Sequence, residues 1–187
     1  FAMTPRAFLD FATHPSWSLS TLTAGAPRPM NFTDSKGSNT FDRGANRSGA
    51  DWAFLEILRD KWQGKLVVKG VTSAADASRV HSLGADAIYV SNHGGRQLDS
   101  VPPSIQLLPL IRAAVGPEFP LLFDSGIRNG EDIVKALAFG ADFVMLGRPA
   151  LFALGAEGAV GLNALLTSFV TDITVVMAQL GIRAIDQ

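Results

Sequence analysis

An α/β fold is the first prediction from the sequence, and the order of its apolar segments supports it. After Gly64, four short apolar runs rich in β-branched and aromatic residues occur at 66–69, 87–91, 121–124 and 143–146. Helical patterns separate or follow these runs, at 74–83, 105–115, 131–139 and 162–180. Apolar strands that alternate with amphipathic helices are typical of a parallel sheet covered by helices.

An internal repeat makes this fold class more specific. Residues 66–92 (LVVKG…SLGADAIYVSN) and 121–148 (LLFDSG…AFGADFVMLGR) both have the order strand, loop, helix, Gly-Ala-Asp, strand. Such βαβ quarters build a (β/α)8 TIM barrel, whereas a doubly wound sheet has less reason to repeat them. A full barrel needs eight strands and typically about 250 residues, and these 187 residues supply four strands. We therefore expect the carboxyl-terminal half of a barrel, about four β/α units.

Residues 1–50 precede the repeat and contain two kinds of sequence. Pro5, followed by mostly apolar residues up to Ala12, predicts a short helix that ends near Pro15, within a helical segment over residues 1–24. Residues 25–50 are mostly Gly, Pro, Ser, Asn, Thr and Asp without an apolar period, which predicts a long flexible loop. Because Phe1 is not an initiator residue, we interpret the amino end as a cut or processed one.

Local signals set the helix limits in residues 51–187, which we expect to form the half barrel. Residues 51–62 carry an apolar stripe that includes Trp52 and Leu55, and so predict a helix. Two helix starts are marked by Ser or Asn followed three residues later by Asp: Ser73 with Asp76, and Asn129 with Asp132. Glycines lie where two helices should end, at Gly84 and Gly140.

The composition excludes several classes of function. With no cysteine, the chain has no disulfide, zinc-thiolate site, iron–sulfur cluster or cysteine nucleophile. Its 16 Lys and Arg against 17 Asp and Glu give a net charge of −1, so nucleic acid is not expected as a partner. No uninterrupted apolar run reaches the roughly 18 residues of a bilayer span, so we expect the positive mean hydropathy to come from core strands and helices.

Polar residues end all four predicted strands, and the chemistry of a barrel lies at those ends. His93 is followed by two glycines and, at the third position, by Arg96. A proton acceptor beside a guanidinium suits acid–base chemistry on an anionic substrate. Lys69, at the first strand end, could lie at the floor of a pocket or be an ordinary solvated lysine. His14 and His81, in or beside ordinary helices, are expected to have no chemical role.

A phosphate site is predicted at the third and fourth strand ends. Residues 124–130 (DSGIRNG) join a strand to a helix start, where backbone amides, the helix terminus and Arg128 would bind an anion. Gly147 and Arg148 end the next strand beside this loop. A phosphorylated cofactor or substrate is the favoured hypothesis. The alternative is a pair of well-formed turns that use glycine for geometry alone.

These motifs together resemble the FMN-dependent α-hydroxy-acid oxidase and dehydrogenase family, which includes glycolate oxidase, L-lactate dehydrogenase and mandelate dehydrogenase. Residues 91–99 (SNHGGRQLD) resemble the active-site signature of that family. The similarity continues through three further segments, 66–70, 124–130 and 147–149. It covers residues 51–181 well and residues 1–50 loosely.

The resemblance implies FMN-dependent oxidation of an L-2-hydroxy acid, lactate- or mandelate-like, to the 2-oxo acid. His93 would be the base, by a hydride or a carbanion route, and Arg96 would bind the substrate carboxylate. Lys69 would lie against the flavin N1/O2 edge, where its charge favours the reduced ring, and Ser91 near the ring. The remaining FMN contacts would come from Gly94, Asp124, Gly126, Arg128, Gly147 and Arg148.

The resemblance also implies partners and reveals departures. The electron acceptor would be oxygen, a quinone or a cytochrome, the assembly a homotetramer, and the location cytoplasmic, with membrane association left open. Residues 25–50 would form a mobile cover of the active site. Family members carry substrate-binding tyrosines and an aspartate partner of the histidine on the first half of the barrel. Tyr89, the only tyrosine, lies inside a strand and does not replace them, so we expect a missing amino-terminal half as a partner.

Two alternatives stay open at this stage. One is another FMN barrel that shares the phosphate loops, such as type 2 isopentenyl diphosphate isomerase or an enzyme like inosine monophosphate dehydrogenase. The segment HGGRQ at 93–97 argues against both. The other is a non-catalytic fragment that keeps residues of the FMN site without a complete pocket.

Overall fold

The computed structural model describes residues 4–25 and 50–185. They belong to two compact units, Phe1–Gly49 and Ala50–Gln187, and each unit is described by itself. The predicted loop at 25–50 lies almost entirely outside the described residues, and its flexibility stays a prediction.

The first unit contains two helices, α1 (Pro5–Thr13) and α2 (Pro15–Ala24). Thr4 caps α1 by accepting a hydrogen bond from the amide of Ala7 at 3.2 Å. The sequence predicted one helix that ends near Pro15, but Pro15 begins a second helix, because proline fits the first turn, where its missing N–H is not needed. The Ser18 hydroxyl donates to the carbonyl of Phe11 at 2.7 Å and joins the two helices.

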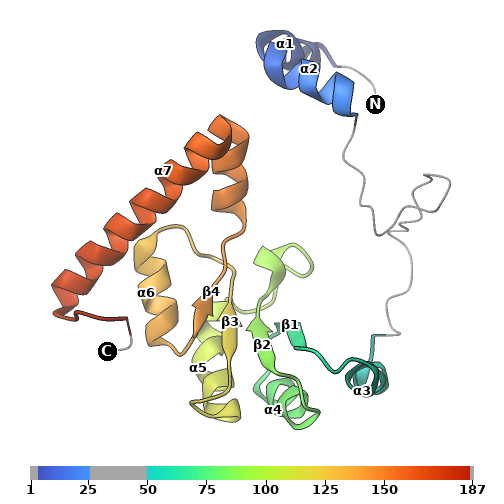
Figure 1. The fold of residues 1–187 in the computed structure, drawn as a ribbon, viewed down its shortest axis with the longest axis vertical. Helices are drawn as coiled ribbons and strands as arrows, with labels where there is room; N and C mark the ends of the chain where they lie inside the picture. Colours follow the sequence, from blue (N-terminus) through green and yellow to red (C-terminus); the bar gives the residue numbers. More distant parts are fainter. Residues whose placement is uncertain (1–3, 26–49, 186–187) are drawn as a thin grey trace. The chain divides into compact units, whose positions relative to one another are not determined.

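The second unit is built on four parallel strands (Figure 1): β1 (Val67–Val71), β2 (Ala87–Val90), β3 (Leu121–Phe123) and β4 (Phe143–Val144). Their order in the sheet is β1-β2-β3-β4, so each strand pairs with the next one along the chain. A barrel has this sequential strand order, whereas in a doubly wound sheet the order of the strands reverses at a switch point. The topology therefore agrees with the predicted half barrel.

Helices alternate with these strands along the chain: α3 (Trp52–Lys61), α4 (Ala74–Ser82), α5 (Ser104–Val115), α6 (Gly130–Ala138) and α7 (Arg148–Leu180). The caps of α4 and α6 are the predicted ones, since Ser73 and Asn129 accept hydrogen bonds from the amides of Asp76 and Asp132. A short 3-10 helix, η2 (His93–Gly95), follows β2 and was not predicted.

The hydrophobic core lies between one face of the sheet and the helices. Ile88, Val90, Leu121 and Phe123 of the central strands are fully buried, and Leu108 and Ile111 of α5 pack in the same cluster. Because side chains alternate along a strand, Tyr89 and Leu122 point to the opposite face, where both are only partly buried. That face would be the interior of a complete barrel.

Two strands differ from their predicted limits. β1 continues beyond Lys69 to Val71, because its register shifts between Lys69 and Val71, where Gly70 has a φ of +91°. A glycine can adopt this left-handed conformation without the strain that a side chain would bring. β4 has only two residues, whereas the apolar run predicted four, and it lies at an edge of the sheet.

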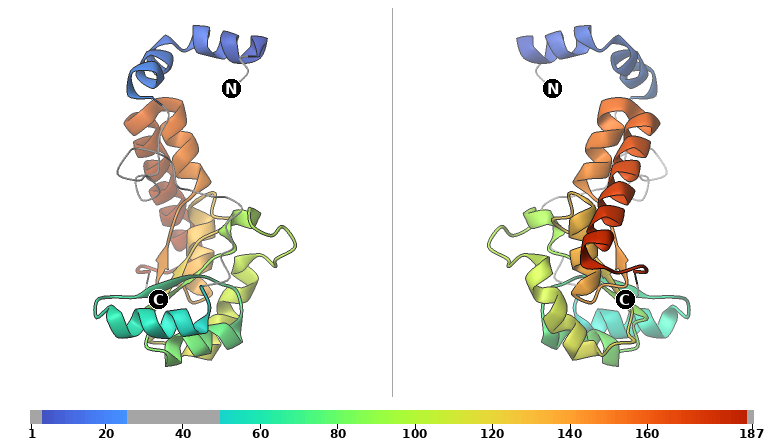
Figure 2. Two further views of the ribbon diagram at one scale, coloured as in Figure 1. Left: turned by 90° about the vertical axis from the view of Figure 1, so that its right-hand side faces the viewer. Right: turned by 90° about the vertical axis from the view of Figure 1, so that its left-hand side faces the viewer.

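The last helix is longer than predicted. α7 begins at Arg148, not near residue 162, and bends at Glu157 and Gly158, so that Figure 2 shows two helical stretches. It contains an 18-residue window with a mean hydropathy of 1.6, of which 6% is buried. By length and composition alone it could cross a membrane, although no uninterrupted apolar run in it reaches the roughly 18 residues expected for a bilayer span. Scattered Ser, Thr and Gly residues interrupt the apolar run but hardly lower its mean hydropathy.

Candidate active site

The carboxyl ends of three strands bring together three of the predicted site residues. The Lys69 ammonium donates to the Ser91 hydroxyl at 2.9 Å and forms an ion pair with Asp124 at 2.8 Å. Ser91 directly follows β2 and Asp124 directly follows β3, while Lys69 lies inside β1 and not at its end. Because the strands are parallel, these positions lie together at the carboxyl end of the sheet, although they are up to 55 residues apart in the chain.

The electrostatics of this cluster favour an ionised Asp124. Burial of the Asp124 carboxyl raises its pKa, but hydrogen bonds from Lys69, Ser91 and Ser125 lower it, and the net result lies below the usual 3.8. Ser125 donates to the other carboxylate oxygen at 2.8 Å. The cluster therefore contains a carboxylate at neutral pH, and the Lys69 ammonium compensates its charge.

His93 lies in the loop after β2 in an unusual backbone conformation. Its φ is +57°, in the left-handed region that few residues with a side chain adopt. The His93 amide donates to the Ser91 hydroxyl at 3.1 Å. The Gly94 amide donates to the side chains of Asn92 at 3.0 Å and Ser125 at 3.2 Å. Such strained residues persist where the surroundings over-determine them, often at functional sites.

Gly70 packs against the His93 ring, a role that was not predicted from the sequence. A Cβ on Gly70 would lie 2.8 Å from Cε1 of His93. The imidazole therefore contacts the bulge of β1 at a place that only glycine leaves open. The signal in the sequence was a glycine directly after the strand lysine, in the segment LVVKG at 66–70.

A second cluster of predicted residues lines a cavity of about 470 Å³, within the usual range of about 300–1,000 Å³ for ligand sites. The loops after β2 and β3, the starts of α5 and α7, and α6 supply its walls, which include Gly94, Ser125, Gly126, Arg128 and Arg148. The Arg148 guanidinium donates to the Gly94 carbonyl, and a Cβ on Gly94 would collide with it. Two guanidinium groups that line one cavity beside the backbone of a glycine are suited to binding a phosphate group.

The amino end of α6 does not offer free amides to an anion. The Arg128 amide donates to the Asp132 carboxylate at 2.9 Å, and the Asp132 amide donates to the Asn129 side chain at 2.9 Å. The Gly130 amide donates to Asp172 of α7 at 3.1 Å. These three donors are therefore already satisfied within the chain. The phosphate site stays a prediction, and the two guanidiniums and the glycine turn support it.

The remaining two predicted residues stay apart from these clusters. The Arg96 side chain is exposed and does not line the cavity, and it makes no hydrogen bond or ion pair with the part of the chain that the structure describes. Gly147 precedes α7, and a Cβ added there would meet nothing within 4 Å. The geometry thus assembles Lys69, Ser91, His93 and Asp124 in one cluster and Gly94, Gly126, Arg128 and Arg148 in another.

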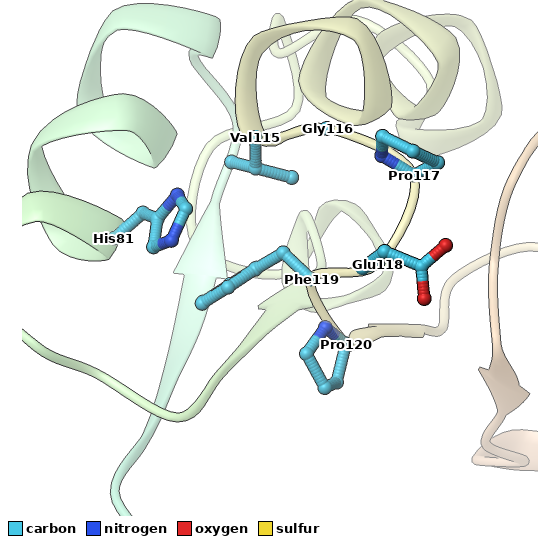
Figure 3. A pocket seen from close by; sticks show the side chains of 7 residues that line it. All are labelled: His81, Val115, Gly116, Pro117, Glu118, Phe119 and Pro120. Atoms are coloured by element: carbon cyan, nitrogen blue, oxygen red, sulfur yellow. The ribbon is translucent and has the colours of Figure 1, made fainter.

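Outside these clusters, a smaller cavity of about 280 Å³ lies at the loop between α5 and β3, hence at the amino ends of the strands (Figure 3). The His81 ring packs there on Phe119, with 4.2 Å between ring centroids. This packing agrees with a structural role for His81. Among residues 4–25 and 50–185, no group of three His, Asp or Glu side chains could hold a metal ion.

Comparison with known proteins identifies the family. The model of the family "FMN-dependent dehydrogenase" matches residues 1–187. The chain is 43% identical over 181 residues to (S)-mandelate dehydrogenase of Pseudomonas putida, with 94% of this chain and 46% of that protein covered. It is 39% identical over 196 residues to L-lactate dehydrogenase of Pseudomonas syringae pv. syringae, with 98% and 50% covered. The chain thus spans about half the length of these curated relatives.

Solved structures agree with this assignment. A crystal structure of the monotopic membrane protein (S)-mandelate dehydrogenase has a TM-score of 0.85 at 41% identity, covering 97% of this chain and 50% of that one. A mandelate oxidase mutant with a monooxide FMN adduct has a TM-score of 0.69 at 40% identity, covering 73% and 44%. The neighbours are (β/α)8 barrel enzymes, so the predicted partial barrel is confirmed, and FMN is the cofactor of the family. The chain belongs to the FMN-dependent dehydrogenase family, which includes 2-hydroxy-acid dehydrogenases and oxidases.

Proposed function

We propose that this chain forms the FMN-binding half of an enzyme that oxidises an L-2-hydroxy acid, lactate- or mandelate-like, to the 2-oxo acid. One observation carries the proposal: the Ser91 hydroxyl contacts both the Lys69 ammonium at 2.9 Å and the His93 amide at 3.1 Å. The cation that would face the flavin and the base that would face the substrate are therefore held through one side chain. Relatives named for mandelate and lactate support the substrate class.

The donor set of the site suits FMN. Arg128 and Arg148 line one cavity and would hold the phosphate, with close approach at Gly94 and Gly126. Asp124 accepts hydrogen bonds and would bind a ribityl hydroxyl, and Gly147 would contribute backbone near the phosphate. Lys69 and Ser91 would lie at the flavin N1/O2 edge, where a fixed positive charge favours the reduced ring. Bound FMN would supply a two-electron acceptor.

The protein residues then have separate tasks toward the substrate. His93 accepts the proton that leaves the substrate, which both the hydride and the carbanion routes require. Arg96 binds the substrate carboxylate, and its exposed guanidinium is not engaged by the described residues. The contact of His93 with Gly70 fixes the imidazole next to the Lys69 cluster.

We further propose that an amino-terminal half barrel, on the same or a separate polypeptide, completes the site. β1 and β4 are the edges of the sheet, and Val67 and Phe143 on them are 43% and 59% exposed. Soluble proteins avoid such open apolar edges. Intact-mass analysis of the active sample should show this second half. A sole 19.8 kDa species that binds FMN stoichiometrically would exclude it.

Location and assembly complete the proposal. We propose a cytoplasmic homotetramer, as the family resemblance implies. We also propose that it associates with the membrane, because one similar solved structure is a monotopic membrane protein and α7 is apolar. Sedimentation velocity should show four copies, and detergent should release the enzyme from the membrane fraction. Oxygen uptake, quinone reduction and cytochrome reduction, assayed side by side, would identify the electron acceptor.

Anaerobic reduction of the flavin tests the proposed reaction. With FMN and both barrel halves present, L-lactate or (S)-mandelate should bleach the flavin absorption. His93→Ala should slow bleaching by about 10²- to 10⁴-fold, the usual contribution of a general base, without loss of FMN. His81→Ala, at the opposite end of the sheet, is the matched control and should keep the wild-type rate. An unchanged rate in H93A would remove the assigned base, and no bleaching with any 2-hydroxy acid would favour a non-catalytic fragment.

A further inference from the structure

Tyr89 lies next to the Lys69 cluster but has no part in the reaction proposed above. It is paired in register with Lys69 of β1 and with Leu122 of β3. Its neighbours Ile88 and Val90 point into the buried core, so the phenol points to the face that would be the barrel interior. The Lys69 ammonium lies over the Tyr89 ring, 3.6 Å from its centroid.

The ring adds a third contact to an ammonium that already makes two. Ser91 and Asp124 accept hydrogen bonds from Lys69, and they directly follow β2 and β3. A lysine ammonium ends a flexible four-carbon chain and is strongly hydrated, so it moves readily unless several groups hold it. A cation within about 6 Å of an aromatic centroid is attracted to the ring face.

Tyr89 provides a neutral aromatic ring for this contact, so it adds no second anion beside Lys69. Burial raises the pKa of the Tyr89 phenol, and a hydrogen bond to the Asp124 carboxylate raises it further, well above its usual 10. The phenol is therefore neutral at physiological pH. Lys69 thus faces a single anion in this cluster, Asp124, and the ring restrains its position without neutralising its charge.

We propose that Tyr89 is a positioning residue for Lys69: its ring fixes the ammonium at the carboxyl end of the sheet. The consequence for the cofactor rests on the proposed function, because the ammonium so fixed would then face the flavin. A tyrosine that only fills the barrel interior would affect stability, whereas a positioning tyrosine affects the freedom of one lysine. The two roles can be separated by experiment.

Competitive acetylation of the protein without FMN, followed by peptide mass spectrometry, measures this freedom. Lys65, whose side chain is 88% exposed, serves as the internal reference. In Tyr89→Leu the labelling rate of Lys69 relative to Lys65 should rise about 3- to 30-fold, as expected for loss of a partly desolvated cation–π contact. Tyr89→Phe is the matched control: it keeps the ring and removes only the hydroxyl with its hydrogen bond to Asp124. Its labelling ratio should therefore stay much closer to wild type than that of Y89L. An unchanged ratio in folded Y89L would overturn the proposal.

A measurement on the wild-type protein does not depend on the folding of a variant. The ring should shift the NMR signals of the Lys69 ε-methylene protons upfield from those of Lys65, and Y89F should retain the shift. Absence of this shift in wild type would overturn the proposal. With FMN bound, folded Y89L should make the flavin harder to reduce at a given potential, with FMN affinity close to wild type. If wild type binds no FMN, the proposed function fails, while labelling and NMR still decide the role of Tyr89.

Discussion

The amino ends of the four strands contain the same interaction twice, whereas the carboxyl ends carry unlike residues at equivalent positions. In the first copy, Arg59 of α3 donates to the Gly84 carbonyl at 3.2 Å and to Asp86 at 3.0 Å. Asp86 in turn accepts a hydrogen bond from the Leu66 amide at 2.9 Å, just before β1. We call this arrangement, Arg59 with Asp86, the first clamp.

The second clamp, Arg112 with Asp142, has the same construction one repeat later in the chain. Arg112 of α5 donates to the Gly140 carbonyl at 2.7 Å and to Asp142 at 2.6 Å. Asp142 accepts from the amide of Leu121, the first residue of β3, at 2.7 Å. The Gly-Ala-Asp repeat of the sequence is therefore a repeat of stabilising hydrogen bonds. Each clamp connects one helix to the starts of two neighbouring strands.

The carboxyl ends of the same repeats have diverged. Lys69 and Asp124 occupy equivalent positions in the two repeats, yet they carry opposite charges and pair with each other at 2.8 Å. Among the described residues, the two non-glycine residues with a positive φ, His93 and Ser125, both lie in the loops at these carboxyl ends. In barrels the amino ends of the strands serve stability and the carboxyl ends serve function. The difference between the two ends fits that division.

The largest effect on stability should come from the second clamp. Arg112→Ala removes the donor to four backbone carbonyls, of Gly116, Pro117, Phe119 and Gly140. Unsatisfied partly buried acceptors and a lost charged hydrogen bond predict a fall of about 2–3 kcal/mol in the free energy of unfolding, measured by urea denaturation. Arg59→Ala should cost less, because Arg59 serves three carbonyls. Slower flavin reduction in folded R112A would contradict the assignment of stability to the amino ends and of function to the carboxyl ends.

A smaller effect, on chemistry more than on stability, is expected at Gly70. Gly70→Ala would place a Cβ 2.8 Å from His93 Cε1 and should slow flavin reduction about 10- to 100-fold by displacing the base. The left-handed backbone adds about 1–2 kcal/mol of destabilisation. Gly116→Ala is the matched control, because Gly116 has a φ of +87° with nothing within 4 Å of its Cβ. Equal rates in G70A and G116A would remove the positioning role of Gly70.

The sequence predicted the elements that depend on local patterns. Apolar runs located the four strands, and Ser73 and Asn129 marked true helix caps. Pro15 predicts a helix end, because proline disfavours the helical conformation of the residue before it, yet it begins α2. The bend at Gly158 hid the true start of α7, since a glycine inside an apolar pattern suggests a loop.

The site was predictable residue by residue but not as an arrangement. Polar residues at strand ends pointed to Lys69, Ser91, His93 and Asp124. Which of them touch depends on the register of parallel strands, and no single segment of sequence contains that register. The same reason hides two contacts from sequence-based prediction. Gly70 contacts His93, which lies on another segment, and the Gly130 amide at the start of α6 donates to Asp172 of α7.

The smallest effect should be a pH dependence of the first clamp. A hydrogen bond from Lys65, followed by one from the Leu66 amide, lowers the pKa of Asp86 to about 2. Because this pKa lies below the usual 3.8, the stabilisation is present above pH 3.8 and is lost as the pH falls through about 2. Asp86→Asn should therefore lower Tm at pH 7, and the difference from wild type should vanish near pH 2. A difference that persists at that pH would show that charge is not the cause.

A crossed FMN titration tests the division between the two ends most directly. FMN affinity and the Tm of the FMN-free protein are measured for wild type, Arg148→Gln and Arg112→Gln. We predict that R148Q weakens FMN binding about 10- to 100-fold, as expected for loss of a charged hydrogen bond to phosphate, with little change in Tm. R112Q should lower Tm and leave the affinity for FMN unchanged. FMN binding that is unaffected in R148Q, or lost equally in both variants, would contradict the placement of the cofactor at the carboxyl ends of the strands.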